Sequence, residues 1–530
     1  MHCQLEMLRK CLRRDIRSTL ESLPSTLDKT YERILEEIPE KRREYAQRLF
    51  QFLVVSVRPF RVEELADILA FKFEAGMAPE FEDCHEADPE EALLSTCSTM
   101  IVIATVNMPL PPYGPARVVQ FAHFSVQEFI TSEHLQISLK SNVAQFHVIP
   151  GQAHTLLAHT CLSLLQSDVW IDECAINPPL AAYAVKHWDD HARFEGEPLE
   201  IKDAMEGLFN LDKPYFTRWV QQYNSHKSRL TDLEQLKAIS LYYAAEFGFS
   251  KLTRHLSRLY AHCINVVLNQ DGTALEAASS GGSLKTVKVL FEQGADVNAQ
   301  GGVYENALQA AAYGGSLEIA DFLLQHGADI NAQGGCFGNA LQAAAYQRSL
   351  EIVNFLLQYG ANINAQGGQY GNALQAAALG GSLKIVDILL QHGANVNAQG
   401  GEYGNALQAA ALRGSLEIVD FLLQHDADIN AQGGQYGNAL QAAVSRGSLK
   451  IVDILLQHGA DVNAQGGWLG KALQAAVLRG SLEIVDILLQ HGANVNAQDE
   501  WCRNALQIAH YIGVNSIIQL LLKHGAIVPE

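Results

Sequence analysis

Apolar and polar positions recur with a period of 33 residues over the C-terminal half of the chain, residues 271–530. Each unit contains a short apolar run, Asn-Ala-Leu-Gln-Ala-Ala, then an amphipathic run ending in Leu-Leu-Gln-His-Gly-Ala, and then the segment Asn-Ala-Gln-Gly-Gly. The leucine of the first run recurs at Leu275, Leu308, Leu341, Leu374, Leu407, Leu440, Leu473 and Leu506. A constant period of this length predicts a stacked repeat, because a unit of two short helices cannot bury its apolar face alone.

Polar residues and glycines within each unit predict where its helices begin and end. Thr273, and an asparagine at the same position of most later units, can cap the first helix. Lys471 departs from this column, which predicts a weaker cap in that unit. Two glycine columns predict the turn between the helices and the end of the second helix, and Arg348 and Asp426 interrupt them. Each unit is therefore expected to hold two helices and a projecting, hairpin-like finger.

The N-terminal half lacks this period and predicts a different architecture. Its expected elements, in chain order, are helices at residues 27–38, 43–57, 62–70 and 89–97, strands at 100–106 and 117–121, and a helix from residue 123. The last three helices before the strands, followed by the hairpin that the two strands form, have the order of a winged-helix domain. Beyond residue 140 the pattern is again helical, as far as a degenerate repeat that precedes the regular ones.

The predicted fold class is therefore mostly α, with a helical and winged-helix N-terminal region followed by an α-solenoid with short β-hairpin fingers. The predicted boundaries are residues 1–45 for a helical segment, 46–140 for the winged helix, 141–235 for a helical connector, 236–270 for a degenerate capping repeat and 271–530 for about eight regular repeats.

Charge and cysteine usage narrow the class of protein. A net charge of -20 argues against a nucleic-acid binder, which normally presents a basic face. The nine cysteines are scattered without a Cys-x-x-Cys pair, which is typical of reduced thiols in the cytosol or nucleus. The N-terminus does not have the pattern of a signal peptide, and the apolar runs are too short to span a membrane. We predict a cytoplasmic protein, with a nuclear location as the alternative.

Motifs that carry chemistry are weak throughout the chain. The string nearest to a phosphate-binding loop begins at Gly466, but its spacing is one residue short and Ala472 cannot ligate a metal ion. A Gly-x-Ser-x-Gly nucleophile elbow is absent. His187 and His191 lie four residues apart without a metalloprotease signature, which favours structural roles for both. No catalytic residue, cofactor or metal site is predicted, and the chain is expected not to be an enzyme.

Three N-terminal segments, residues 22–35, 58–66 and 119–129, resemble the region that follows the NACHT module in fungal NACHT–ankyrin proteins of the STAND class. The predicted winged helix is similar to the one named after GPI inositol-deacylase. The repeats resemble ankyrin repeats, with Asn-Ala-Leu-Gln-Ala-Ala where that family has Thr-Pro-Leu-His-x-Ala. The resemblance implies the sensor arm of a signalling protein whose NACHT domain would lie upstream of this chain. It also implies that fingers and first helices line a concave binding face.

Positions that vary against the uniform repeat are the candidate binding residues, because aromatic and arginine side chains are favoured at interfaces. The candidates are Tyr304, Phe337, Tyr370, Tyr403, Tyr436, Trp468 and Trp501 on the fingers, and Tyr313, Tyr346, Arg413, Arg446 and Arg479 at the ends of the first helices. The finger aromatics have an alternative role, in which they only pack finger on finger. The three arginines, called the arginine row below, lie in an acidic chain, so we expect them to meet an acidic partner.

Three functions remain open at this level. The first is a non-enzymatic scaffold that recognises a protein partner and associates with a NACHT-domain protein. The second is a DNA-associated transcriptional regulator that uses the winged helix. The third is the C-terminal part of a signalling NTPase whose phosphate-binding domain is not in this chain.

Overall fold

The computed structural model describes residues 26–73, 80–81, 88–97, 99–108, 114–138, 140–167, 178–194, 201–224, 232–467, 470–498 and 504–527. Any helix before residue 26, part of the predicted segment 1–45, lies outside this set. The chain divides into two compact units, Met1–Ser240 and Leu241–Glu530.

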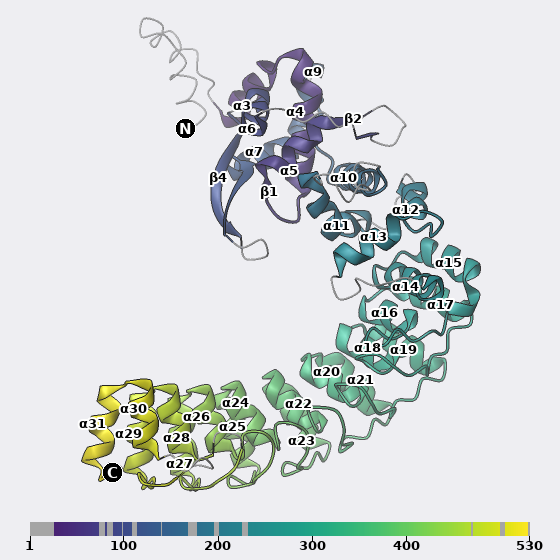
Figure 1. The fold of residues 1–530 in the computed structure, drawn as a ribbon. Coiled ribbons are helices and arrows are strands. Elements are labelled where there is room, and N and C mark those ends of the chain that lie inside the picture. The colour runs from purple at the N-terminus through teal and green to yellow at the C-terminus, as the bar shows by residue number, and fades with distance from the viewer. Residues whose placement is uncertain are drawn as a thin grey trace, which may run out of the picture. The chain divides into compact units, whose positions relative to one another are not determined.

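The first unit combines helices with a small antiparallel sheet (Figure 1). Its elements are α3 (Leu27–Glu36), α4 (Glu40–Val55), β1 (Phe60–Arg61), α5 (Val62–Ala66), η1 (Asp67–Ala70), β2 (Phe71–Lys72), β3 (Glu80–Phe81), α6 (Pro89–Cys97), β4 (Ile101–Met108), β5 (Gly114–Phe121), α7 (Phe124–Ile130), α8 (Glu133–Gln136), α9 (Ser141–Ala144), α10 (Pro150–Leu165), α11 (Pro179–Ala192), α12 (Lys202–Leu208) and α13 (Tyr215–Tyr223). The sheet order is β1-β5-β4, with Ile101 opposite Phe121 and Phe60 opposite Val119. The predicted hairpin is therefore present. The structure adds β1 and the β2–β3 pair, which the sequence pattern did not predict because each of these strands has only two residues.

Apolar side chains from distant segments form the core of this unit. Phe50 of α4 is fully buried and lies 6.1 Å from Phe121 of β5 and 6.0 Å from Phe146, measured between ring centroids. Trp188 and Trp219 pack edge to face at 6.0 Å, and the Trp219 indole N–H donates to the Val185 carbonyl (3.0 Å). Burying the ring and satisfying the indole N–H together hold α11 against α13.

Contacts also cross the predicted boundary between residues 140 and 141. The buried carboxylate of Asp67 in η1 accepts a hydrogen bond from the Leu180 backbone N–H at the start of α11 (2.8 Å). An N-terminal amide of a helix carries a partial positive charge, so this carboxylate is stabilised there. The winged-helix region and the helical connector predicted from the sequence thus share one compact unit.

The second unit is a solenoid of paired helices. After α14 (Leu233–Glu246), α15 (Ser250–Leu259) and η5 (Ala261–Cys263) come the regular pairs α16 (Ala274–Ser280) and α17 (Leu284–Glu292), α18 (Ala307–Gly314) and α19 (Leu317–Gln325), α20 (Ala340–Tyr346) and α21 (Leu350–Gln358), α22 (Ala373–Gly380) and α23 (Leu383–Gln391), α24 (Ala406–Arg413) and α25 (Leu416–Gln424), α26 (Ala439–Arg446) and α27 (Leu449–Gln457), α28 (Ala472–Arg479) and α29 (Leu482–Gln490), and α30 (Ala505–Ile512) and α31 (Asn515–Lys523). Within this unit the first helix of each regular pair lies on the inner side of a curve (Figure 1). The mostly α fold class and the solenoid are confirmed.

Local chemistry explains why every unit adopts the same conformation. Asn405 caps α24 by accepting from the Gln408 backbone N–H (2.8 Å), and the Gln408 side chain accepts from the Asn405 N–H (2.9 Å). This reciprocal arrangement satisfies two amides that the helix leaves unpaired. Lys471 makes no such side-chain bond at the start of α28, as its sequence position predicts. Arg348 and Asp426 keep the left-handed backbone of the glycines they replace, with φ of 64° and 61°.

The fingers form a continuous strip along the solenoid. Each finger is the segment around the Gly-Gly pair, closed in several repeats by a bridge such as the one between Gly400 and Gly404. The backbone N–H of Glu402 donates to the Gln369 carbonyl of the preceding finger (2.8 Å), and Gln435 repeats this bond to Glu402 (2.8 Å). Backbone hydrogen bonds thus link each finger to the next, and they fix the spacing between the side chains of successive fingers.

Candidate functional site

The aromatic residues of the fingers stack along the solenoid. The ring centroids of Tyr304 and Phe337 lie 6.0 Å apart, those of Phe337 and Tyr370 5.6 Å, and those of Tyr370 and Tyr403 6.1 Å, with interplanar angles of 9°, 24° and 14°. We call these four residues the aromatic ladder. Near-parallel rings at this separation are in the range of favourable offset stacking.

Aromatic residues at the ends of the first helices extend the ladder sideways. The Tyr313 ring lies 5.0 Å from that of Tyr304 and 4.8 Å from that of Phe337, and the Tyr346 ring lies 4.6 Å from that of Tyr370. Finger tips and helix ends therefore line the same face, which the sequence predicted only through the family resemblance.

Burial separates the ladder into packing and exposed members. Phe337 and Tyr370 are 6% and 5% exposed, so for these two the packing role that the sequence left open accounts for their positions. The ladder members Tyr304 and Tyr403 are half-buried, as is Tyr436 on the following finger. Desolvation raises the pKa of Tyr304 and Tyr403, so their phenols stay neutral and able to donate a hydrogen bond.

The arginine row is exposed and regularly oriented. Each side chain lies beside the turn glycine of the preceding repeat: a Cβ added to Gly381 would lie 3.3 Å from Arg413 Nε, and one added to Gly414 would lie 3.4 Å from Arg446 Nε. Arg479 takes the same direction and donates from Nη1 to the Ser445 carbonyl (2.6 Å). Among the residues that the structure describes, no carboxylate forms an ion pair with any of the three.

Two exposed apolar residues beside the row escaped the sequence reasoning as binding candidates. Leu478 is 52% exposed and Tyr511 is 87% exposed, and they occupy the helix-end position that Tyr313 and Tyr346 fill in earlier repeats. The sequence could have identified Tyr511, because it lies one 33-residue period after residue 478. Trp468 and Trp501 lie outside the part of the chain that the structure describes.

A buried glutamine column lies beneath this face. The side-chain Nε2 atoms donate to a carbonyl of the next finger over 2.8–3.4 Å at Gln309, Gln342, Gln375, Gln408, Gln441 and Gln474. The first repeat has Glu276 instead, which is 1% exposed, and neither carboxylate oxygen finds a hydrogen-bond partner in the described part of the chain. Burial raises the pKa of this carboxyl to about 8; the Thr273 backbone amide opposes the shift, and the nearby charge of Glu305 adds to it. Sequence reasoning missed this departure, although Glu276 is visible in the aligned column.

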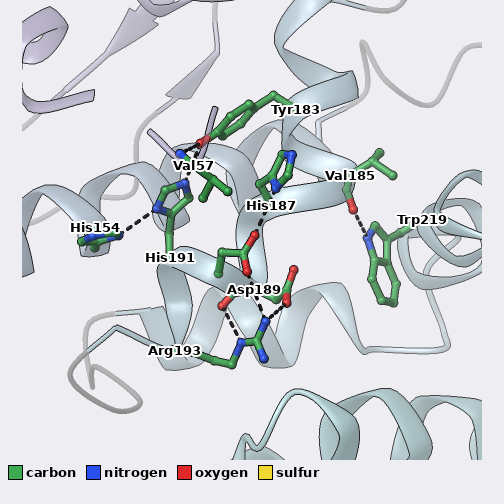
Figure 2. A network of polar contacts seen from close by, with 10 residues as sticks. Val57, His154, Tyr183, Val185, His187, Asp189, His191, Arg193 and Trp219 are labelled. Carbon is green, nitrogen blue, oxygen red and sulfur yellow. Dashed lines mark hydrogen bonds and ion pairs between the residues drawn. The ribbon is translucent and has the colours of Figure 1, made fainter. Parts of the chain in front are cut away.

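A second polar cluster lies in the first unit, around His191 of α11 (Figure 2). The Val57 backbone N–H donates to the Tyr183 oxygen (3.2 Å), so the Tyr183 hydroxyl is free to donate to His191 Nε2 (2.8 Å). The Nδ1–H of His191 then donates to Nδ1 of His154 (2.8 Å). Both nitrogens of the fully buried His191 are thus engaged, and His187 bonds Asp190 instead (3.0 Å). The hydrogen bonds of the two histidines thus go to different partners.

Acidification is expected to destabilise this cluster. Burial lowers the pKa of His191 from 6.5 to about 3, so between these values the unfolded chain binds a proton that the folded chain does not. Stability therefore falls as the pH drops from about 6.5 to about 3, by up to a few kcal/mol. Urea unfolding across this pH window measures the slope, and His191→Gln is expected to reduce it. An unchanged slope in the variant would show that other groups cause the acid sensitivity.

Within the described residues, no helix is both long and apolar enough to span a membrane. The Gly466 string belongs to a finger that is closed by a bridge between Gln465 and Lys471, so its glycines serve a turn.

Comparison with known proteins identifies the repeats. Models described as ankyrin repeats match residues 275–324, 300–367, 341–433, 374–466 and 432–499. The chain is also similar to azaphilone pigments biosynthesis cluster protein L of Monascus ruber, with 33% identity over 274 residues that cover 47% of this chain and 55% of that protein. It thus spans little more than half the length of that relative. A solved structure, the ankyrin repeat domain of human ASB11, matches with 27% identity and a TM-score of 0.37 over 42% of this chain and 99% of that chain. The C-terminal region of the present chain consists of ankyrin repeats.

Proposed function

We propose that this chain is a non-enzymatic recognition protein whose ankyrin repeats bind a protein partner through the face formed by the fingers and the first helices. The observation that carries the proposal is the arginine row. Three exposed guanidinium groups without a carboxylate partner among the described residues occur at one position of three successive repeats. Arginine and tyrosine are enriched in interface hot spots, and the exposed Tyr511 occupies the helix-end position of the repeat that follows the row.

A proximity-labelling experiment in cells of the source organism tests this proposal. The variant reverses the arginine row (Arg413→Glu, Arg446→Glu, Arg479→Glu). A matched control makes the same charge change on the exposed second helices (Lys285→Glu, Lys384→Glu, Lys450→Glu). We expect a defined set of proteins to be labelled by the wild type and the control but lost with the arginine variant. Identical labelling by all three chains would contradict the proposal.

A protein-packing role for the N-terminal region is supported by the pairing of its basic residues. Arg58 forms a two-point ion pair with Glu64 of α5, with an Nη2–Oε1 distance of 2.6 Å, and Arg117 of β5 pairs with Glu90 of α6. A helix that reads DNA needs unpaired basic residues, and α6 begins with Pro89, Glu90 and Glu91. These pairings favour protein contacts over DNA binding for the winged-helix region.

The finer proposal is that this region couples the repeats to a NACHT-type switch, as in the STAND proteins that it resembles. The order of α4, α5 and α6 before the β4–β5 hairpin supports it. The expected outcome is an in-frame NACHT coding sequence upstream of the Met1 codon, or a NACHT-domain protein among those lost with the arginine variant. Finding neither would leave the repeats as a binding module without this switch.

A further inference from the structure

The arginine row has a fixed geometry that constrains the partner. Its members occupy equivalent positions in consecutive repeats, and their first helices α24, α26 and α28 pack side by side. Packed helices lie about 8–10 Å apart, so neighbouring guanidinium groups repeat with about that spacing. The side chains share one direction, because each lies beside the turn glycine of the repeat before it. A partner that meets all three must therefore present acceptors at this interval along a line.

The charge of the row selects carboxylates. Guanidinium groups bind planar carboxylates in a two-point geometry. The chain as a whole carries a net charge of -20, so an isolated positive row in it marks a place where an acidic segment is preferred.

A second row of the same period runs parallel to the first. Tyr403 and Tyr436 lie on the fingers of the repeats that carry Arg413 and Arg446, and both rings are half-buried. The contact between Tyr370 and Tyr346 shows that finger tips reach the helix-end position next to which the arginines lie. The repeats that carry Arg413 and Arg446 therefore each offer one half-buried tyrosine and one guanidinium group.

The backbone conformation that matches two rows of this period is polyproline II. It rises about 3.1 Å per residue with three residues per turn, so every third side chain returns to the same side after about 9.3 Å. A β-strand returns to the same side after about 6.6 Å, which is too short. An α-helix rises only about 1.5 Å per residue, so about one of its side chains in seven would face each arginine.

On the basis of the proposed binding function, we infer that the ligand of this face is an extended acidic peptide with a carboxylate at every third residue. In the turns beside Arg413 and Arg446, one of the two intervening side chains meets Tyr403 or Tyr436, and the other faces solvent. Beyond Arg479 the next position of the row is the half-buried Ile512, with the exposed Tyr511 beside it, so an apolar residue follows the last carboxylate at that end.

Fluorescence anisotropy with labelled synthetic peptides tests the inference on the full chain. The first peptide repeats Glu-Pro-Gln four times and carries one terminal leucine. It is synthesised in two versions, one with the leucine at the N-terminus and one with it at the C-terminus. The second has the same composition, with its glutamates clustered. A third is α-helical with a glutamate at every seventh residue, and a single-stranded oligonucleotide is the fourth probe.

We expect the first peptide to bind about tenfold more tightly than the second. Reversal of the arginine row should abolish binding, whereas the Lys285, Lys384 and Lys450 control should retain it. Circular dichroism confirms that each variant is folded. The inference is overturned by equal affinity for the spaced and clustered peptides, by tighter binding of the helical peptide or the oligonucleotide, or by no binding at all. If proximity labelling still loses a partner with the arginine variant, the binding function stands and only the peptide class is wrong.

Discussion

Replacing Glu276 with glutamine is expected to stabilise the ankyrin domain by about 3–5 kcal/mol above about pH 8, and to change little below about pH 4.5. The charged carboxylate is buried at the position where later repeats have a glutamine that donates to backbone carbonyls. At Gln375, for example, Nε2 donates to the Gly404 carbonyl (2.7 Å) and to the Ala398 carbonyl (3.2 Å). A protonated carboxyl can imitate this amide, whereas a carboxylate cannot.

The sign of the pH dependence follows from the raised pKa of Glu276. Below about pH 4.5 the folded and unfolded chains both carry the proton; between about 4.5 and 8 only the folded chain keeps it. Stability therefore falls as the pH rises through this window. The first unit has the opposite dependence over part of this range, because the lowered pKa of His191 makes stability fall on acidification.

Urea unfolding over a pH series, combined with hydrogen exchange of the α16 amides, measures the Glu276 effect. The mirror variant Gln375→Glu is the matched control, and we expect it to import the same alkaline sensitivity into the fourth regular repeat. A wild-type pH profile that survives unchanged in Glu276→Gln would show that the carboxyl is not the responsible group.

Replacing Gly401 with alanine is expected to cost about 3 kcal/mol or more, whereas the same change at Gly393 should cost about 1 kcal/mol. Both glycines have a left-handed backbone, with φ of 64° and 88°. A Cβ on Gly401 would lie 2.5 Å from the Gly371 nitrogen and 2.6 Å from the Gln369 oxygen, both backbone atoms of the preceding finger. A Cβ on Gly393 would meet nothing within 4 Å.

The two substitutions thus separate steric conflict between fingers from backbone strain. Asp426 already occupies the position equivalent to Gly393 with φ of 61°, so this column tolerates a side chain. Midpoints of thermal and urea unfolding provide the comparison. Equal losses for Gly401→Ala and Gly393→Ala would mean that the fingers relax without cost and that their close approach contributes little.

Much of the proposed binding face was predictable because the conformation of each repeat depends on residues close together in the sequence. A 33-residue period, an asparagine cap and a glycine turn each depend on residues within one unit. They therefore determined the solenoid, its helix boundaries and the columns in which candidate binding residues lie. The weak cap at Lys471 was likewise readable from one position.

Exposure within those columns depended on neighbouring repeats. The sequence listed Phe337, Tyr370 and Arg413 together, but stacking between fingers buries the first two, whereas the arginine stays exposed. Identical spacing along the chain cannot distinguish them, because the atoms that cover a ring come from the preceding and following units.

By itself, the sequence determined a mostly helical chain, a stacked repeat and a set of variable positions on it, since short-range patterns encode helices and turns. Only the tertiary structure decided which groups lose contact with water. Tyr183 meets Val57 across 126 residues of chain, and Glu276 is sealed by a finger of the next repeat. The pKa of a side chain follows its desolvation and its partners in space, and neither can be read from its neighbours in the sequence.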